Sequence, residues 1–249
     1  MIPIDANEVK KSKAKSNVLF EDSMMEDWTK NWFLDGKHAT VENLADGLFF
    51  SAGPITKYMD KVLYNAHHAV LWTKQEFEGD IRISYEGKRV DEGRYGNVLI
   101  YVQAQGVGRG EYDEDIYAWR KLREIPAMGK YFACMNCLSI SLRRDLRLRR
   151  YPTRVFETRE RLDMLIGEKV DWHGDTRDVW YKYEFEKRKT SFTFRTYDLE
   201  SGKVLAEHVW DTTEQKEGRN PEFVEKGRIG IRHMATKQWY YRNFKVEQL

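Results

Sequence analysis

The last third of the chain alternates aromatic and polar residues with a period of two, a pattern that few folds other than a β-sheet can use. It is clearest in Val179–Glu186 (VWYKYEFE) and Ser191–Asp198 (SFTFRTYD). Because successive side chains of a strand point to opposite faces, each segment has an apolar face and a polar face. A turn at Lys187–Thr190 joins them into a predicted hairpin, and a second turn at Asp198–Lys203 (DLESGK) leads into Val204–Trp210.

Short strands are predicted along most of the rest of the chain. They are Val18–Phe20, Ala39–Asn43, Gly47–Ser51, His67–Phe77, Asp80–Arg89, Gly96–Gly110, Tyr131–Ser141, Gly227–Arg232 and Trp239–Glu247. Asp46-Gly47 is a predicted hairpin turn, and His67–Phe77 is predicted to pair with Asp80–Arg89 across Glu78-Gly79. Strands spaced by roughly 8–12 residues with little helix favour an all-β fold, an antiparallel β-sandwich or jelly roll.

The 249 residues contain no repeat, low-complexity segment or linker. We therefore expect a polar, lysine-rich arm over residues 1–17 and a single domain over residues 18–249. No run resembles a secretory signal or reaches transmembrane length, so a soluble chain is expected, although a leader could have been removed and the compartment is not decided.

Composition excludes several classes of function. Lys and Arg number 42 against 40 Asp and Glu, which does not favour broad affinity for nucleic acid or an anionic membrane. Cys134 and Cys137 lie three positions apart on a predicted strand, so their side chains would point to opposite faces and form no disulfide. Two cysteines without a Cys/His cluster do not indicate a zinc site, and no cofactor is expected. The acidic loop Glu111–Asp115 offers oxygen ligands for Ca²⁺ but is also typical of a solvated loop.

The strand predicted within Gly96–Gly110 (GNVLIYVQAQGVGRG) carries the main functional expectation. One face is an ordinary core stripe, whereas the other becomes more polar along the strand and comprises Asn97, Leu99, Tyr101, Gln103 and Gln105. We interpret this polar face as the lining of a carbohydrate groove. Asn136 on the following strand is expected either to join the groove or to be a hydrogen-bonded core amide.

The closing segments WYKYEFEKRKTSFTFRTYDLESGKVL and GRIGIRHMATKQWYYRNFKVEQL resemble the end of concanavalin-like lectin and glucanase jelly rolls. LFEDSMMEDWTKNW and VLWTKQEFEGDIRISYE match the same type, so the resemblance extends over nearly the whole chain from Val18. More narrowly, the chain resembles the YesU-like family of unknown function, some members of which lie beside pectin-degradation genes. The resemblance implies a carbohydrate ligand and assigns no catalytic residue.

Glycoside hydrolases of this architecture carry a Glu-x-Asp-x-x-Glu-like strand where this chain has Tyr101, Gln103 and Gln105. Retaining hydrolysis needs two carboxylates about 5–5.5 Å apart, so the substitution argues against that mechanism. Cleavage of a uronate glycoside by β-elimination instead needs a base, an acid and a group that neutralises the carboxylate. We expect the base and acid among Tyr101, His68 and His233, with Gln103, Gln105 and Asn136 binding substrate.

Other residues extend this hypothesis toward an acidic plant or algal glycan. Trp72 and Trp119, and with them Trp180 and Trp239, are candidate platforms for sugar rings, although at least half are expected in the core. The basic run from Arg143 to Arg150, with Arg154 and Arg159, either forms a rim that attracts carboxylates or is a solvated loop or exposed strand. Two alternatives stay open: a lectin-like protein that binds glycan without cleaving it, and a hydrolase that uses Asp113 and Asp115. The oligomeric state is not predicted.

Overall fold

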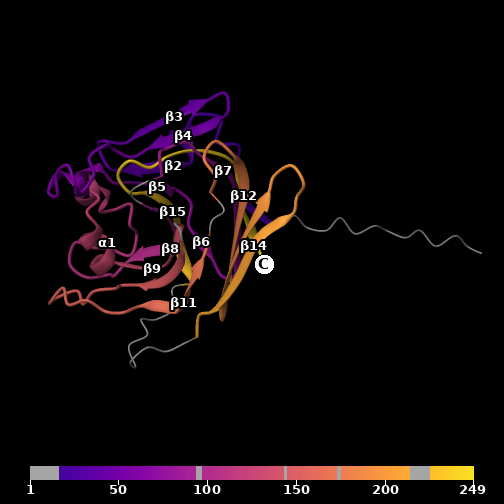
Figure 1. The fold of residues 1–249 in the computed structure, drawn as a ribbon. Helices are drawn as coiled ribbons and strands as arrows, with labels where there is room; N and C mark the ends of the chain where they lie inside the picture. The colour runs from indigo at the N-terminus through magenta and orange to yellow at the C-terminus, as the bar shows by residue number, and fades with distance from the viewer. Residues whose placement is uncertain (1–16, 94–96, 143–144, 173–174, 214–224) are drawn as a thin grey trace, which may run out of the picture.

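A computed structural model describes residues 17–93, 97–142, 145–172, 175–213 and 225–249. In these ranges two antiparallel eight-stranded sheets face each other (Figure 1). Sheet A runs in the order β14 (Val204–Asp211), β13 (Ser191–Asp198), β12 (Trp180–Lys187), β7 (Ile81–Arg89), β16 (Gln238–Gln248), β4 (Gly47–Ser51) and β3 (Thr40–Leu44), with β1 (Val18–Asp22) beside β16. The predicted all-β antiparallel sandwich is confirmed.

Sheet B has the order β11 (Leu165–Asp171), β10 (Asp145–Tyr151), β9 (Met135–Leu142), β8 (Val98–Gly106), β15 (Lys226–His233), β5 (Ala69–Thr73) and β2 (Trp32–Asp35), with the short β6 (Phe77–Glu78) beside β15. The short helices are η1 (Trp28–Lys30), η2 (Leu63–His67), η3 (Arg120–Arg123) and α1 (Met128–Cys134). None of the helices in the described ranges is long and apolar enough to cross a membrane.

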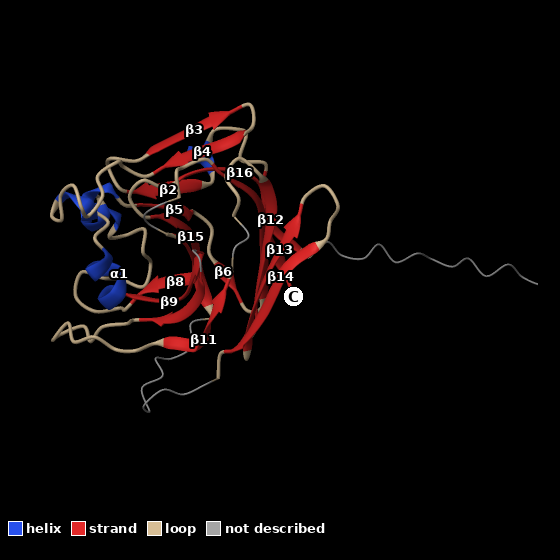
Figure 2. Cartoon of the chain, viewed as in Figure 1, coloured by secondary structure: helices blue, strands red, loops and turns tan. Residues whose placement is uncertain are grey.

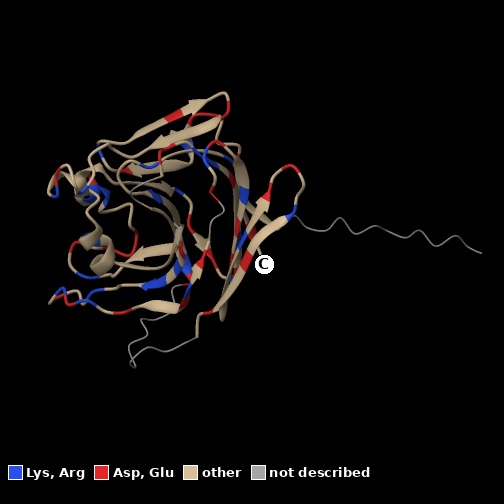
Figure 3. Ribbon diagram, in the orientation of Figure 1, with Lys and Arg blue, Asp and Glu red and all other residues tan. Residues whose placement is uncertain are grey.

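The main core lies between the two sheets. It is built from the inward positions of alternating strands, such as Ile83 and Tyr85 of β7 and Ile100 of β8, all fully buried or nearly so. The strands of sheet A carry interspersed acidic and basic residues (Figure 3). Arg82, for example, pairs with Glu186 at 2.7 Å. Polar pairs of this kind are typical of the sheet face that does not pack on the core.

A second core lies on the other side of sheet B. Residues 107–134, here called the cover segment, pack over the outward-facing side chains of this sheet. Figure 2 shows α1 and neighbouring helical turns on the side of sheet B that faces away from β12 and β13. The buried members of this second core are Phe33, Val70, Trp72, Tyr101, Ala104, Ile116, Trp119, Tyr131, Ala133, Cys134, Met135, Cys137 and Tyr151.

Hairpins with short turns are confirmed by the structure. β12 pairs with β13 across residues 188–190, and Asp198 N donates to Lys203 O in the next turn. β3 pairs with β4 around the predicted Asp46-Gly47 turn. In each hairpin the turn residues and both strands are close in sequence.

Three predictions of local structure are wrong. β5 and β7 do not form a hairpin, because β5 pairs with β15 and β2 in sheet B while β7 pairs with β12 and β16 in sheet A. The segment predicted as one strand from Tyr131 starts as helix α1, and the strand begins only at Met135.

The third is the basic run, whose described part is neither a solvated loop nor an exposed strand. It forms β10 inside sheet B, because Leu146 and Leu148 point into the main core. Arg143 and all of the predicted arm except Asn17 lie outside the described residues.

Candidate functional site

The predicted sugar-facing strand is covered. Tyr101 is fully buried and stacks between Trp72 and Tyr131, with ring centroids 5.3 and 5.9 Å away. Burial, followed by the nearby Tyr151, raises the pKa of Tyr101 well above its ordinary value. Tyr101 and Trp72 therefore form the floor of the second core and do not line an open groove.

Two of the four tryptophans expected to bind sugar, Trp72 and Trp119, make hydrogen bonds within the protein. Trp72 Nε1 donates to Asp35 Oδ2 at 2.7 Å, and the same oxygen accepts from Arg123 Nε at 2.6 Å and Tyr131 OH at 2.8 Å. Trp119 Nε1 donates to the backbone oxygen of Asp113 at 2.9 Å. The hydrogen bonds from Arg123 and Tyr131 to Asp35 fasten the cover segment to sheet B, whereas the Trp119 hydrogen bond lies within the cover segment.

The two histidines predicted as acid or base are fully buried. His68 Nδ1 accepts from Ala235 N at 3.0 Å, and burial lowers the pKa of His68 to about 2, with Arg232 and His67 acting in the same direction. His233 Nε2 lies 2.7 Å from Tyr241 OH, and burial lowers the pKa of His233 to about 3.

The ring of His233 stacks on Phe50 in the main core, while Tyr101 lies in the second core on the other face of sheet B. The structure thus does not bring the three predicted catalytic residues together at an open surface.

The predicted substrate-binding amides are separated by a bulge in β8. Gln103 has a φ of +50°, and the register with β9 shifts between Val102 and Gln105. The buried side chain of Gln103 donates to the carbonyls of Phe77, Gly79 and Glu225 at 3.3, 2.9 and 3.0 Å. Gln105 is half-buried and pairs in register with the half-buried Asn136.

The acidic loop supports the cover segment as well. Asp115 forms an ion pair with Arg228 at 2.8 Å. Its partial burial raises the pKa, but hydrogen bonds from Tyr117 N and Arg228 outweigh that effect and lower it. In the described ranges no group of three or more His, Cys, Asp or Glu side chains is placed to hold a metal ion.

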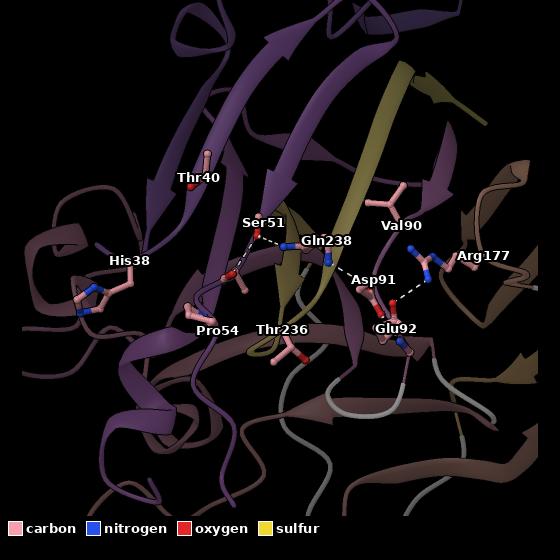
Figure 4. A pocket seen from close by; sticks show the side chains of 12 residues that line it. His38, Thr40, Ser51, Pro54, Val90, Asp91, Glu92, Arg177, Thr236 and Gln238 are labelled. Atoms are coloured by element: carbon pink, nitrogen blue, oxygen red, sulfur yellow. Dashed lines mark hydrogen bonds and ion pairs between the residues drawn. The ribbon is translucent and has the colours of Figure 1, made fainter. Parts of the chain in front are cut away.

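An open pocket of about 580 Å³ lies at one end of sheet A (Figure 4). Thr40, Ser51 and Gln238 stand opposite one another on β3, β4 and β16 and form one wall. The rest of the lining comes from the loops that follow β7 and precede β12 and from the loops before β3, after β4 and before β16. The full lining is His38, Thr40, Ser51, Ala52, Pro54, Val90, Asp91, Glu92, Gly93, Arg177, Thr236 and Gln238.

Asp91 holds this pocket in shape. Its carboxylate accepts from Lys237 Nζ at 2.9 Å, from Gly93 N at 2.7 Å and from Gln238 N at 3.1 Å. Gln238 Nε2 in turn donates to Ser51 Oγ at 3.2 Å. The β7 loop is thereby tied to the first residue of β16, and the amide and hydroxyl groups are presented at fixed positions.

The rim of the pocket carries an exposed ion pair. Arg177 Nη1 lies 2.8 Å from Glu92 Oε1, and the two side chains are 48% and 78% exposed. Such a pair contributes little to stability and exchanges readily with other polar groups. It leaves a guanidinium and a carboxylate available to a ligand.

His38 of the pocket lining stacks on a second histidine, His67. His38 and His67 have ring centroids 4.5 Å apart and nearly parallel planes. Burial, followed by the neighbouring His38, lowers the pKa of His67. Gly53 is required here because a Cβ at this position would lie 2.0 Å from His67 Nδ1.

An aromatic row continues from the pocket along the outer face of sheet A. It consists of Phe49, Tyr240 and Trp180, all half-buried. Phe49 and Tyr240 lie two residues beyond Ser51 and Gln238 on the same strands, and their rings are 5.2 Å apart. Lys88 Nζ lies 4.8 Å from the Tyr240 ring and 5.0 Å from the Trp180 ring.

Of this row, only Trp180 was among the predicted sugar platforms, and Trp239 is buried in the main core. Phe49 and Tyr240 were missed. Alternation in GLFFS and QWYYRNF could have identified them. Phe49 and Tyr240 occupy the outward positions beside Phe50, Trp239 and Tyr241, which point into the main core. The pocket was missed because its lining comes from segments distant in sequence.

Comparison with known proteins identifies the fold. No family model and no curated protein matches the chain. Among solved structures, a protein of unknown function with a galectin-like fold from Bacillus subtilis is 19% identical, with a TM-score of 0.68, and the match covers 93% of this chain and 96% of that one. The narrower resemblance to the YesU-like family stays a proposal.

Two further structures share the architecture. The exoplasmic/lumenal domain of VIP36 in a Ca²⁺/Man₃GlcNAc-bound form is 9% identical, with a TM-score of 0.55 over 88% of this chain and 86% of that one. A structure reported with endo-acting O-glycanases of the human gut microbiota that initiate mucin breakdown is 12% identical, with a TM-score of 0.55 over 93% and 99%. At these identities the likeness concerns the fold alone: the chain is a galectin-like, concanavalin-like β-sandwich.

Proposed function

We propose that this protein is a lectin-like glycan-binding protein whose ligand occupies the pocket and the aromatic row. The observation that carries the proposal is the position of the pocket at the end of that row. A polar recess and a line of half-buried rings on one sheet face form a continuous surface.

The chemistry of this surface suits a sugar. The faces of a sugar ring present C–H groups that pack on aromatic side chains, while its hydroxyls need both donors and acceptors. Phe49, Tyr240 and Trp180 supply the rings. Ser51 and Gln238 supply hydroxyl and amide groups whose positions are fixed by hydrogen bonds.

The solved structures with the same fold support carbohydrate as the ligand class. The VIP36 domain is described in a form bound to Man₃GlcNAc, and the gut microbial structure was reported with O-glycanases. We transfer the class of ligand and not the position of their sites.

We further propose that the preferred glycan is neutral. Asp91 is paired with Lys237, and Glu92 with Arg177, so each carboxylate that lines the pocket has a basic partner. A uronate carboxylate would have to displace Glu92 from Arg177 and would then lie beside it. The acidic plant or algal glycan expected from the sequence therefore becomes the competing ligand.

Cleavage has no comparable support. Tyr101, His68 and His233 are fully buried, and Asp115 is engaged by Arg228. The groups proposed for β-elimination would reach a polysaccharide only after the cover segment or the main core opened. We therefore favour binding without cleavage.

A glycan array followed by calorimetry tests this proposal. The wild-type protein should bind neutral oligosaccharides, and Gln238→Ala and Tyr240→Ala should each raise Kd at least about fivefold, since a hydrogen bond or a stacked ring contributes roughly 1 kcal/mol or more. Gln105→Ala is the matched control, because this half-buried glutamine lies on the other sheet and should leave Kd unchanged.

Other outcomes separate the alternatives. Absence of binding to any neutral or uronic glycan would overturn the proposal. Binding that Q238A and Y240A leave unchanged would place the site elsewhere. Growth of the unsaturated-uronate absorbance would establish β-elimination, and new reducing ends without that absorbance would establish hydrolysis.

A further inference from the structure

Two arginine side chains are fully buried in the second core. Arg123 comes from η3 in the cover segment, and Arg232 comes from β15 in sheet B. Arg123 lies over the ring of Trp119 at 4.1 Å, and Arg232 lies over the ring of Tyr131 at 4.3 Å. Guanidinium groups remain charged at any pH that a folded protein tolerates, so both charges need compensation inside the protein.

Asp35 compensates Arg123. Its Oδ2 is 2.6 Å from Arg123 Nε and also accepts from Trp72 Nε1 and Tyr131 OH. Asp35 and Arg123 thus form a buried pair with no net charge. This carboxylate is close enough to Arg232 to act on it electrostatically, but no hydrogen bond joins the two.

Arg232 has no such partner. Its Nη2 donates to Pro126 O at 2.7 Å, whereas Nε and Nη1 have no hydrogen-bond partner among the described residues. The other groups near it are His68, which burial keeps neutral, and the phenols of Tyr101, Tyr131 and Tyr151. Aromatic rings attract the cation but carry no charge, so one positive charge is left over in the second core.

Tyr101 adds a second donor near Arg232. Its hydroxyl is buried and has no hydrogen-bond partner in the described part of the chain, and its ring stacks 5.9 Å from Tyr131, the ring that Arg232 covers at 4.3 Å. A phenol and a guanidinium with free N–H groups together favour a negative ligand.

We propose that Arg232 and Tyr101 hold a small monovalent anion of the halide class inside the second core. Both side chains are 0% exposed, which excludes the carboxylate of a glycan. The anion would complete the charge balance between sheet B and the cover segment. It would therefore stabilise the cover segment and take no part in recognition of sugar.

Thermal unfolding at constant ionic strength tests the proposal, with sodium chloride replacing sodium methanesulfonate stepwise. A ligand that binds only the folded protein raises Tm with its concentration, by about 3 to 6 °C for each tenfold increase above its Kd. Arg232→Met should abolish this dependence. Tyr101→Phe, which keeps the ring packing, should shift it to higher chloride concentrations.

Tyr85→Phe is the matched control. Tyr85 is also buried with an unpartnered hydroxyl, but it lies in the main core, and its pKa is raised by burial alone. The chloride dependence of Y85F should equal that of the wild type. Crystals grown in sodium bromide should show an anomalous peak between Arg232 and Tyr101.

The proposal is overturned if the Tm of the wild type does not depend on the chloride fraction, or if Y101F and R232M both keep the full dependence. If R232M does not fold, the chloride dependence of Y101F and the anomalous bromide peak still test the proposal. Electron density at that position without an anomalous peak would assign the site to a water molecule.

Discussion

His68 and His233 are buried as neutral side chains, and this has a consequence for stability. Burial lowers the pKa of His68 to about 2 and that of His233 to about 3. In the unfolded chain both should titrate near 6.5. Below that pH the unfolded chain binds two protons that the folded protein does not, so stability falls as the pH falls from about 6.5 toward 3.

We predict that each histidine contributes about 2 kcal/mol to the loss of unfolding free energy between pH 7.5 and pH 5.0. His68→Asn keeps an acceptor for Ala235 N and removes the titration. Urea unfolding at the two pH values should show that H68N loses about 2 kcal/mol less unfolding free energy than the wild type. Equal losses in the two proteins would mean that His68 is protonated in the folded state.

Among the elements, the bulge in β8 explains why the predicted polar face is interrupted. Strict alternation puts Tyr101, Gln103 and Gln105 on one face, but the positive φ of Gln103 turns its side chain toward the carbonyls of Phe77, Gly79 and Glu225. Gly227 makes the bulge feasible, since a Cβ there would lie 2.5 Å from the carbonyl carbon of Gln103. The bulge therefore fastens β6 and the start of β15 to β8.

We predict that Gln103→Ala lowers the unfolding free energy by about 1 to 3 kcal/mol, because three backbone carbonyls lose a donor that is itself buried. Hydrogen exchange should accelerate around residues 77–79 and 226–228, while glycan affinity at the pocket stays unchanged. Gln105→Ala, two residues away, should cost less than about 0.5 kcal/mol. If Q103A instead lowers glycan affinity without a loss of stability, Gln103 belongs to the binding site.

The elements also show what the sequence could predict. Alternation and turn residues identify β3–β4 and β12–β13, because the partners are neighbours in the chain. The sequences of β5 and β7 resemble a hairpin just as closely, yet the seven residues between these strands cross from one sheet to the other. Which sheet each strand joins depends on partners that are distant in the sequence. The same limit hides the pocket, whose walls come from residues as distant as Thr40 and Gln238.

At the scale of the whole molecule, the chain is organised around two cores that share sheet B. Alternation correctly gave Tyr101 and Val102 opposite faces, but nothing in the strand itself reveals that residues 107–134 return to bury the Tyr101 face. Among the described residues, no hydrophobic cluster like the second core covers the outer face of sheet A. The open pocket and the aromatic row consequently lie on sheet A.

Mutations in the two cores should have different effects on folding. Trp119 is 4% exposed, packs on Tyr112 at 5.1 Å and on Arg123 at 4.1 Å, and lies wholly within the second core. We predict that Trp119→Ala opens the cover segment while the sandwich stays folded, because the main core makes no use of this ring. Trypsin should then cut after Arg120, Lys121 or Arg123 with the far-ultraviolet circular dichroism nearly unchanged.

Phe185→Ala provides the comparison, since Phe185 is fully buried between the sheets. It should cost about 3 to 5 kcal/mol in global stability, as large-to-small substitutions in a packed core do, without selective cleavage in the cover segment. W119A should also lose the chloride dependence of Tm, because Arg232 becomes accessible to water, and should keep its glycan affinity on sheet A. Cooperative unfolding of the entire W119A protein would instead show that the second core and the sandwich form one folding unit.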